Sequence, residues 1–141
     1  MKNWGDKMKR ANYCFVCSEI NPKGLHIKFR YLENGVAIAE FSLEKEYEGY
    51  PGIAHGGILA AILDDAMGNI EYLKGYVAYT TELHTRYLKP SYIGEKLIVR
   101  GWIKNARLKI VETEGDIRNE NGEVKVRAKA KYYIAGKINE I

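Results

Sequence analysis

The chain has 141 residues, of which 46% are hydrophobic and 28% are charged, and its formal net charge is +4 at pH 7. These values are typical of one globular domain and exclude the concentrated positive charge of a nucleic-acid-binding protein, although a small anionic ligand would suit them. No run reaches the roughly 18 apolar residues of a membrane span, and residues 1–12 are too polar for a signal peptide, so we expect a cytoplasmic protein.

We expect a single domain over residues 1–141, with residues 1–24 as an N-terminal extension that holds Cys14 and Cys17 in a CxxC arrangement. Three interpretations of this pair stay open. A zinc site needs four ligands, which nearby His26 or a second subunit's CxxC could help to supply. A thioredoxin-like redox motif needs a strand before it and a helix after it, whereas residues 21–24 form a turn. The third interpretation, a pair of reduced structural thiols, is the one that we favour.

The first half of the chain predicts two strands and one helix. Apolar and polar residues alternate over residues 25–31, as in a half-buried strand. Residues 33–35 predict a tight turn, and residues 36–43 predict the partner strand. After an irregular loop, residues 55–74 are so apolar that they predict a buried helix, which Gly75 ends.

Beyond this helix every predicted element is a strand, over residues 77–88, 96–104, 109–118 and 124–134. The last strand alternates most regularly, with residues from Val124 to Tyr132 on a dry face and Lys125, Arg127, Lys129 and Lys131 on a wet face. A single apolar helix must be covered on most sides, and a curved sheet can cover it. The expected fold class is therefore α+β, a long central helix wrapped by a curved antiparallel sheet of about six strands.

The predicted helix begins with His55-Gly56-Gly57. The first turn of a helix carries unpaired amides and the positive end of the helix dipole, and glycines there let a carbonyl group approach the backbone. The Gly56 amide could therefore stabilise an oxyanion. Since the dipole disfavours a charged imidazole at this end, we expect His55 to orient the turn by hydrogen bonding rather than to act as a general base.

Two carboxylates, Asp64 and Asp65, lie in the apolar middle of the predicted helix. A buried charge needs either hydrogen-bonding partners or a chemical role. Asp64 shares a helical row with small residues that leave space beside it, as a substrate would require. Asp65 points about 100° away around the helix, which favours a structural or interface role.

The order of elements and the His-Gly-Gly start followed by Leu63-Asp64 resemble the hotdog-fold thioesterases, in particular the PaaI-like branch that hydrolyses acyl-CoA thioesters. The resemblance extends over residues 22–134. It implies that Asp64, eight residues after Gly56, is the catalytic acid, acting as general base or as nucleophile. It also implies that the Gly56 amide polarises the thioester carbonyl, and that a hydroxyl early in the next strand, Thr80 or its neighbour Thr81, assists.

Other features of this family bear on the subunit arrangement. Hotdog relatives are dimers with active sites at the interface, which implies a homodimer or homotetramer here. Alternation places Thr80 on the polar face of its strand, opposite the residues that should cover the helix, so we expect it to reach the Asp64 of a partner subunit and not its own. Some relatives also carry an Asn or Gln six residues before the His, and that position is Gly49 here.

Candidate substrate-binding residues surround this motif. Gly57, Tyr50 and Ile53 would line an acyl pocket with the apolar residues of the helix, and Thr81 is a further candidate. Coenzyme A phosphates would attract cations, and the candidates by charge are Arg86, Lys89, Lys104 and Arg107.

The sequence thus predicts a thioesterase that hydrolyses an acyl-CoA to a free acid and coenzyme A, with no metal and no redox cofactor. Two alternatives remain. The chain could be an acyl-CoA-binding or sensing module without turnover, or a hydroxyacyl thioester dehydratase using His55 and Asp64. Neither a nucleic acid nor a membrane is expected as a partner.

Overall fold

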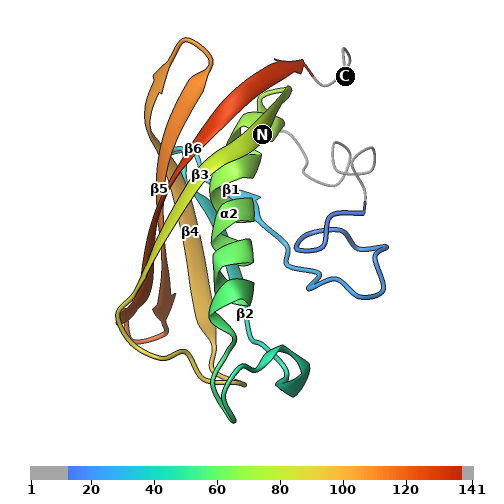
Figure 1. The fold of residues 1–141 in the computed structure, drawn as a ribbon, viewed down its shortest axis with the longest axis vertical. Coiled ribbons are helices and arrows are strands. Elements are labelled where there is room, and N and C mark those ends of the chain that lie inside the picture. The colour runs from blue at the N-terminus through green and yellow to red at the C-terminus, as the bar shows by residue number, and fades with distance from the viewer. Residues whose placement is uncertain (1–12, 138–141) are drawn as a thin grey trace.

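The computed structural model describes residues 13–137 (Figure 1). The first part of the predicted N-terminal extension, residues 1–12, lies outside the described residues. No helix in the described part of the chain is long and apolar enough to cross a membrane.

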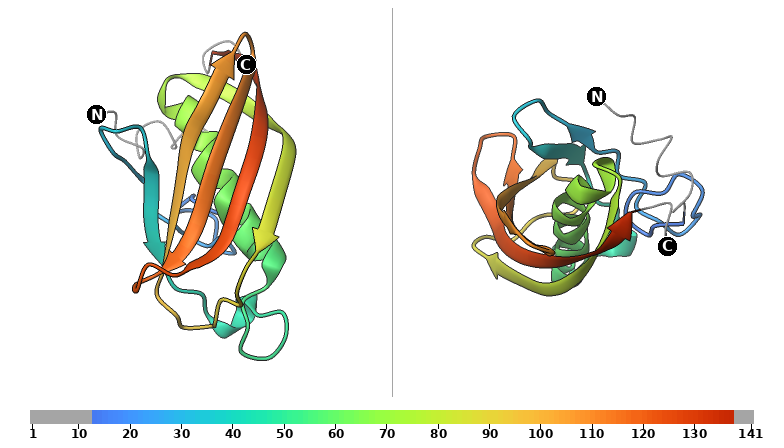
Figure 2. Two further views of the ribbon diagram at one scale, coloured as in Figure 1. Left: turned by 90° about the vertical axis from the view of Figure 1, so that its left-hand side faces the viewer. Right: turned by 90° about the horizontal axis from the view of Figure 1, so that it is seen from above.

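One long helix, α2 (Gly56–Leu73), lies against the concave face of a six-stranded antiparallel sheet, which confirms the predicted fold class. Figure 2 shows the sheet curling around this helix. The strand order in the sheet is β1-β2-β4-β5-β6-β3, so β3 forms one edge. The strands are β1 (Arg30–Tyr31), β2 (Ala37–Phe41), β3 (Tyr76–Tyr87), β4 (Leu97–Arg107), β5 (Ile110–Asn119) and β6 (Val124–Lys137), and a short 3-10 helix, η1 (Lys45–Tyr47), lies between β2 and α2.

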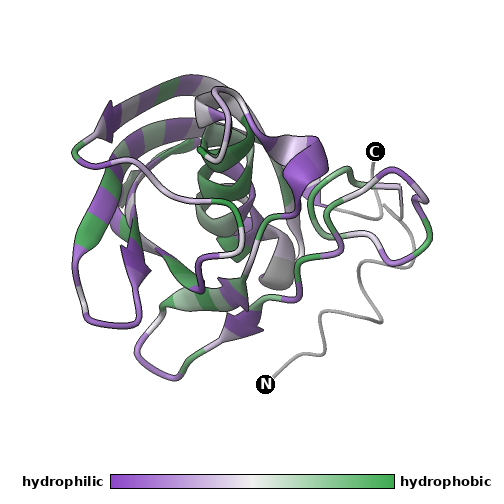
Figure 3. Ribbon diagram, turned by 90° about the horizontal axis from the view of Figure 1, so that it is seen from below, coloured by the Kyte–Doolittle hydropathy of each residue, from purple (hydrophilic) through white to green (hydrophobic). Residues whose placement is uncertain are grey.

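The helix begins and ends where its local sequence predicts. His55 is the N-terminal cap, Lys74 is the C-terminal cap, and Gly75 follows with a left-handed φ of 100°. Figure 3, viewed from below, shows the apolar helix enclosed by the sheet. Its buried apolar residues form the centre of the core: Leu59, Ile62, Leu63, Ala66, Met67 and Ile70.

The strand predicted over residues 25–31 is much shorter than expected, because only Arg30–Tyr31 joins the sheet. His26 adopts a left-handed φ of 54°, which interrupts the extended backbone. The amides of Leu25 and Ile27 instead donate to the carbonyls of Phe15 and Val16. This segment therefore pairs with the CxxC turn and not with the sheet.

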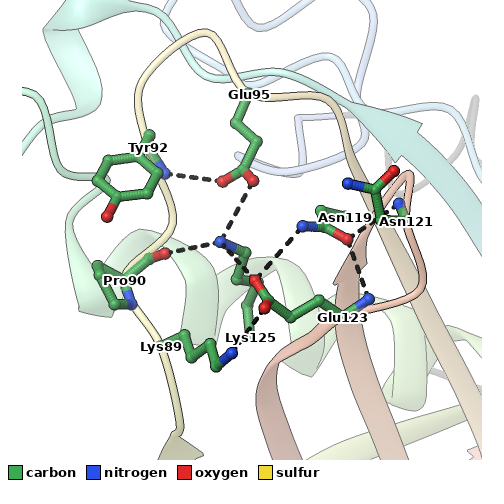
Figure 4. Close-up of polar contacts among 8 residues, drawn as sticks. All are labelled: Lys89, Pro90, Tyr92, Glu95, Asn119, Asn121, Glu123 and Lys125. Atoms are coloured by element: carbon green, nitrogen blue, oxygen red, sulfur yellow. Dashed lines mark hydrogen bonds and ion pairs between the residues drawn. The ribbon is translucent and has the colours of Figure 1, made fainter.

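Lys125 corrects the prediction of a uniformly wet face on the last strand, since it is only 4% exposed. Its Nζ lies 3.2 Å from Glu95, 3.4 Å from Glu123 and 3.1 Å from the carbonyl of Pro90 (Figure 4). The loop after β3 folds over the start of β6, and these oxygens compensate the buried ammonium group. Alternation along one strand cannot reveal a loop that covers it.

Two glycines let the helix approach the sheet closely. Gly101 of β4 pairs with Gly115 of β5. A Cβ atom added to Gly101 would lie 2.8 Å from the carbonyl oxygen of Ala66, and one added to Gly115 would lie 3.3 Å from the Met67 side chain. The first contact involves helix backbone, which cannot move aside as a side chain can.

We therefore expect Gly101→Ala to destabilise the protein by about 2 kcal/mol, since overpacking outweighs the roughly 0.4–1 kcal/mol that alanine gains in the unfolded chain. Urea unfolding measures this difference. Lys104→Ala, at an exposed position of the same strand, is the control and should change stability by less than about 0.5 kcal/mol. Equal stability of Gly101→Ala and the wild type would contradict the packing argument.

Candidate active site

A cleft of about 620 Å³ opens at the N-terminal end of α2. The loop before the helix forms one wall, and the residues after β3 form the other. Of the predicted site residues, the cleft brings together Tyr50, Ile53, His55, Gly56 and Lys89. Gly49 also lines it, and a Cβ atom there would lie 3.4 Å from the Cα of His55.

The first turn of α2 leaves one amide available. His55 Nδ1 accepts a hydrogen bond of 2.9 Å from the Gly57 amide, and the His55 carbonyl accepts from the amides of Ile58 and Leu59. The Gly56 amide has no acceptor recorded among residues 13–137. Since Nδ1 is an acceptor, a neutral His55 ring carries its proton on Nε2. His55 thus caps the helix, and the Gly56 amide stays free to bind an external acceptor.

Tyr87, at the end of β3, also contacts this turn and was missed by the sequence analysis. Its hydroxyl donates a hydrogen bond of 2.6 Å to the carbonyl of Gly56. A Cβ atom on Gly56 would lie 3.4 Å from the Tyr87 ring. The tyrosine therefore orients the peptide group that follows the free amide. This contact forms because the fold brings the end of β3 back to the start of α2, and the local sequence does not predict it.

Asp64 lies two turns further along α2 and is held by two hydroxyl groups. Its Oδ1 atom accepts hydrogen bonds of 2.9 Å from Thr80 Oγ1 and 2.8 Å from Tyr132 OH. The same phenol lies 3.0 Å from the Asp64 backbone carbonyl. Within residues 13–137, the Oδ2 atom has only a 3.3 Å contact with Thr80. The carboxylate is therefore anchored through one oxygen, while the other keeps most of its capacity to accept a proton.

Tyr132 acts as a donor to Asp64. Burial of its ring and the adjacent Asp64 charge hold the pKa of Tyr132 well above its ordinary value, so the phenol keeps its proton. The sequence analysis placed Tyr132 on the dry face of the last strand but gave it no role. A buried tyrosine hydroxyl needs a partner, and that rule could have pointed to a polar group on the helix.

The prediction that Thr80 cannot reach Asp64 of its own subunit was wrong. The pairing of β3 with β6 skips a residue between Thr80 and Glu82, a β-bulge that turns Thr80 toward the helix. Thr81, the extra residue, donates to the carbonyl of Lys131 and does not reach Asp64. The face predicted to cover the helix is also largely open, since Tyr79, Leu83 and Tyr87 are 54%, 38% and 48% exposed.

The cations predicted to bind coenzyme A phosphates do not all lie beside the cleft. Lys89 lines the cleft, but its Nζ lies 2.6 Å from the carboxylate of Glu123, as Figure 4 shows. Arg86 lines a different depression, on the outer face of the sheet, beside the Asp116 carboxylate and its partners Arg100 and Arg118. Arg86 and the cleft are therefore not part of one site within a single chain.

Asp65 faces away from Asp64, toward the CxxC turn. Its Oδ1 atom lies 3.4 Å from Cys14 Sγ, at hydrogen-bonding distance for sulfur. Burial raises the pKa of Asp65 well above its usual value. A hydrogen bond from Cys17 lowers the pKa of Cys14 to about 5, against the effect of burial. His26 is not part of this cluster, because its Nε2 lies 2.6 Å from the carbonyl of Asn21.

The sequence profile of the thioesterase superfamily matches residues 51–126, and the chain belongs to this family. Two curated relatives are provisionally named as esterases. A protein of Archaeoglobus fulgidus is 27% identical over 77% of this chain and 69% of its own length. A protein of Saccharolobus solfataricus is 25% identical over 92% of this chain and 93% of its own length.

Solved structures share the hotdog fold. A thioesterase superfamily protein is 29% identical with a TM-score of 0.78 over 83% of this chain, although the match spans only 61% of that protein. Escherichia coli PaaI, from the phenylacetic acid degradation operon, has a TM-score of 0.76 at 17% identity over 92% of this chain and 93% of its own. A Streptococcus mutans protein solved bound to acetyl CoA has a TM-score of 0.73 at 22% identity, over 79% and 90% of the two chains.

We expect Tyr132→Phe to lower stability by about 1–2 kcal/mol, because Asp64 loses the hydrogen bond from the buried Tyr132 hydroxyl. Thermal and urea unfolding measure the change. Tyr133→Phe is the matched control, since its ring is 40% exposed on the opposite face of the strand. If both variants were equally stable, the Tyr132 hydroxyl would have no part in holding Asp64.

Proposed function

We propose that the protein is an acyl-CoA thioesterase in which Asp64 delivers water, or attacks directly, and the Gly56 amide stabilises the oxyanion. The observation that supports it best is the Asp64 carboxylate, fixed through Oδ1 by Thr80 and Tyr132 with Oδ2 left available. Family membership supports thioester hydrolysis in general. The acetyl CoA complex of the S. mutans neighbour supports a coenzyme A thioester as substrate.

The proposed reaction balances without a cofactor. As general base, Asp64 takes a proton from water, and the hydroxide adds to the thioester carbonyl while the Gly56 amide stabilises the oxyanion. The tetrahedral intermediate then expels the coenzyme A thiolate, which receives the proton from Asp64. As nucleophile, Asp64 would first form an anhydride, which water then hydrolyses. Thr80 holds the carboxylate in position in both routes.

One helix cannot place both groups on the same carbonyl. Asp64 follows Gly56 by eight residues, which corresponds to about 12 Å along a helix axis. A thioester carbonyl carbon and its oxygen are separated by little more than 1 Å, so donor and base must approach within a few ångströms of each other. We infer that the Gly56 amide of one subunit works with Asp64 of a second, antiparallel subunit. The exposed tyrosines and leucine of edge strand β3 would suit such an interface.

The alternatives have less support. Dehydratase chemistry needs a free imidazole, whereas His55 Nδ1 is engaged with the Gly57 amide. A binding module without turnover would explain the lack of a side-chain donor at Gly49, but it would not require a carboxylate with one free oxygen. The expected cytoplasmic location, and the assignment of Arg86 and Thr81 to substrate binding, stay predictions from the sequence.

We expect Asp64→Asn to lower the release of coenzyme A thiol by a hundredfold or more. A panel of phenylacetyl, benzoyl, hexanoyl and palmitoyl thioesters, with thiol release measured at steady state, tests this and defines the acyl pocket. Glu71→Gln, another buried carboxylate on α2, is the control and should keep wild-type turnover. Tight binding of an acyl-CoA by the wild type without thiol release would favour the binding module.

The inference that the Gly56 amide and Asp64 of one site come from different subunits leads to a separate prediction. Gly56→Pro removes the amide at the first helical position, where proline is tolerated, and the ψ of 128° at His55 is compatible with a following proline. We expect it to lower turnover by about a hundredfold, since an oxyanion donor is lost. Gly56→Ala keeps the amide and is the control.

Mixing Gly56→Pro and Asp64→Asn subunits then distinguishes the arrangements. If the two groups come from different subunits, a mixed dimer contains one intact site and one doubly altered site. Equal mixing after unfolding and refolding should restore about a quarter of wild-type turnover. If both groups came from one chain, no site would be intact and activity would stay at the level of the variants.

A further inference from the structure

Three potential metal ligands meet on the face of α2 that carries Asp65, about 100° around the helix from Asp64. Cys14 Sγ, Cys17 Sγ and a carboxylate oxygen of Asp65 all lie within 4.8 Å of one another. Cys14 and Asp65 are separated by 51 residues in the sequence, so the fold brings this cluster together. We propose that these residues bind a zinc ion, which fastens the N-terminal segment to the helix.

The spacing of the cluster matches tetrahedral zinc. Zinc bonds thiolates at about 2.3 Å and carboxylates at about 2.0 Å, so tetrahedral geometry holds sulfur and oxygen about 3.5 Å apart and two sulfurs about 3.8 Å apart. Cys14 Sγ and Asp65 Oδ1 are already 3.4 Å apart. The ligand atoms all lie within 4.8 Å of one another, so the remaining pairs need to approach by at most about 1.3 Å, which side-chain rotation allows.

An unsatisfied oxygen points to a ligand. The Oδ2 atom of Asp65 is buried and has no hydrogen-bond partner among the described residues. No Lys, Arg or His of residues 13–137 forms a recorded ion pair with this carboxylate. Leaving a buried carboxylate oxygen without a partner is destabilising, because its lost hydration is not replaced. A cation between Asp65 and the sulfurs would satisfy it.

The surroundings hold the two sulfurs in place. The Cys17 amide donates to Cys14 Sγ at 3.4 Å, and the Ser18 amide donates to the Cys14 carbonyl at 3.1 Å. Asn69, one turn along α2 from Asp65, places its Nδ2 4.0 Å from Cys17 Sγ. Such outer hydrogen bonds orient metal ligands and tune their donor strength. Both cysteines are half-buried, so an ion could still enter.

The donor set selects the metal. Two sulfurs exclude calcium and magnesium, which take oxygen ligands, while the carboxylate is a poor ligand for Cu(I). Zinc accepts both types of donor. Water would fill the fourth position. A disulfide between the cysteines explains the cluster less well, since it would remove the thiol contact with Oδ1 and leave Oδ2 without a partner.

The test uses the full chain, purified under reducing conditions from zinc-supplemented cells. We expect about one zinc per chain by elemental analysis. Replacement by Co²⁺ should give a thiolate-to-cobalt charge-transfer band together with the intense visible bands of tetrahedral cobalt. Because these measurements need only the wild type, a variant that fails to fold does not prevent the test.

Variants identify the ligands. Cys14→Ser and Cys17→Ser should each weaken the charge-transfer band and lower cobalt affinity by at least about tenfold. Asp65→Asn keeps both thiolates, so it should lower cobalt affinity by at least about tenfold and change the visible bands. Glu71→Gln, a buried carboxylate on α2 outside the cluster, should bind cobalt as the wild type does. Circular dichroism confirms that each variant is folded.

Three results would overturn the proposal. The first is that reduced wild-type protein, with both thiols free, contains no zinc and gives no cobalt charge-transfer band. Asp65→Asn could bind cobalt with unchanged spectrum and affinity, which would exclude the carboxylate as a ligand. Mass spectrometry could find a Cys14–Cys17 disulfide that persists in the presence of zinc, which would support a redox pair. Metal content and cobalt spectra do not depend on thiol release, so failure of this proposal and failure of the proposed function are distinguishable.

Discussion

The arrangement of the candidate site depends on how one carboxylate is accommodated in an apolar helix. A carboxylate in an apolar helix loses part of its hydration, which is costly unless hydrogen-bond donors replace the water. Asp64 obtains its two donors from strands that are distant in the sequence, Thr80 of β3 and Tyr132 of β6, both through Oδ1. These bonds satisfy one oxygen and leave the second underused. The stability of the helix and the proposed chemistry therefore rest on the same three side chains.

A β-bulge makes this arrangement possible. Without the skipped residue between Thr80 and Glu82, the threonine would face solvent with Glu82, and Asp64 would lose one donor. The bulge lies in edge strand β3, where an irregular residue disrupts fewer ladder hydrogen bonds than in the interior of the sheet. The same edge presents exposed aromatic residues, so the strand that completes the site within the chain is also the surface where a second subunit would pair.

Helix α2 carries two adjacent carboxylates with different surroundings. Asp64 meets hydroxyl groups beneath the sheet, whereas Asp65 meets the sulfurs of the CxxC turn on the other side. One hundred degrees of helix rotation separates them and gives them unrelated environments. The helix start adds a third element, the free Gly56 amide, with the His55 side chain capping the Gly57 amide and Tyr87 bonded to the Gly56 carbonyl. The helix thus carries Asp64, Asp65 and the Gly56 amide, on which the proposed site and the candidate metal cluster depend.

The sequence by itself determined the α+β class, the helix with its His55 cap and Gly75 terminator, four strands after it, and Asp64 as the candidate catalytic residue. The fold elements follow from local properties, namely periodicity and capping. The cost of a charge in an apolar run singled out Asp64 and Asp65, and the resemblance to the hotdog thioesterases implied the catalytic role of Asp64. Tertiary structure alone decided that Thr80 faces its own Asp64, that Tyr132 and Tyr87 contact the helix, that Lys125 is buried, and that Asp65 meets Cys14 and Cys17. Each of these depends on a bulge, a covering loop or a contact between distant segments. Alternation within one element carries no information about such features, because they are set by how the elements pack.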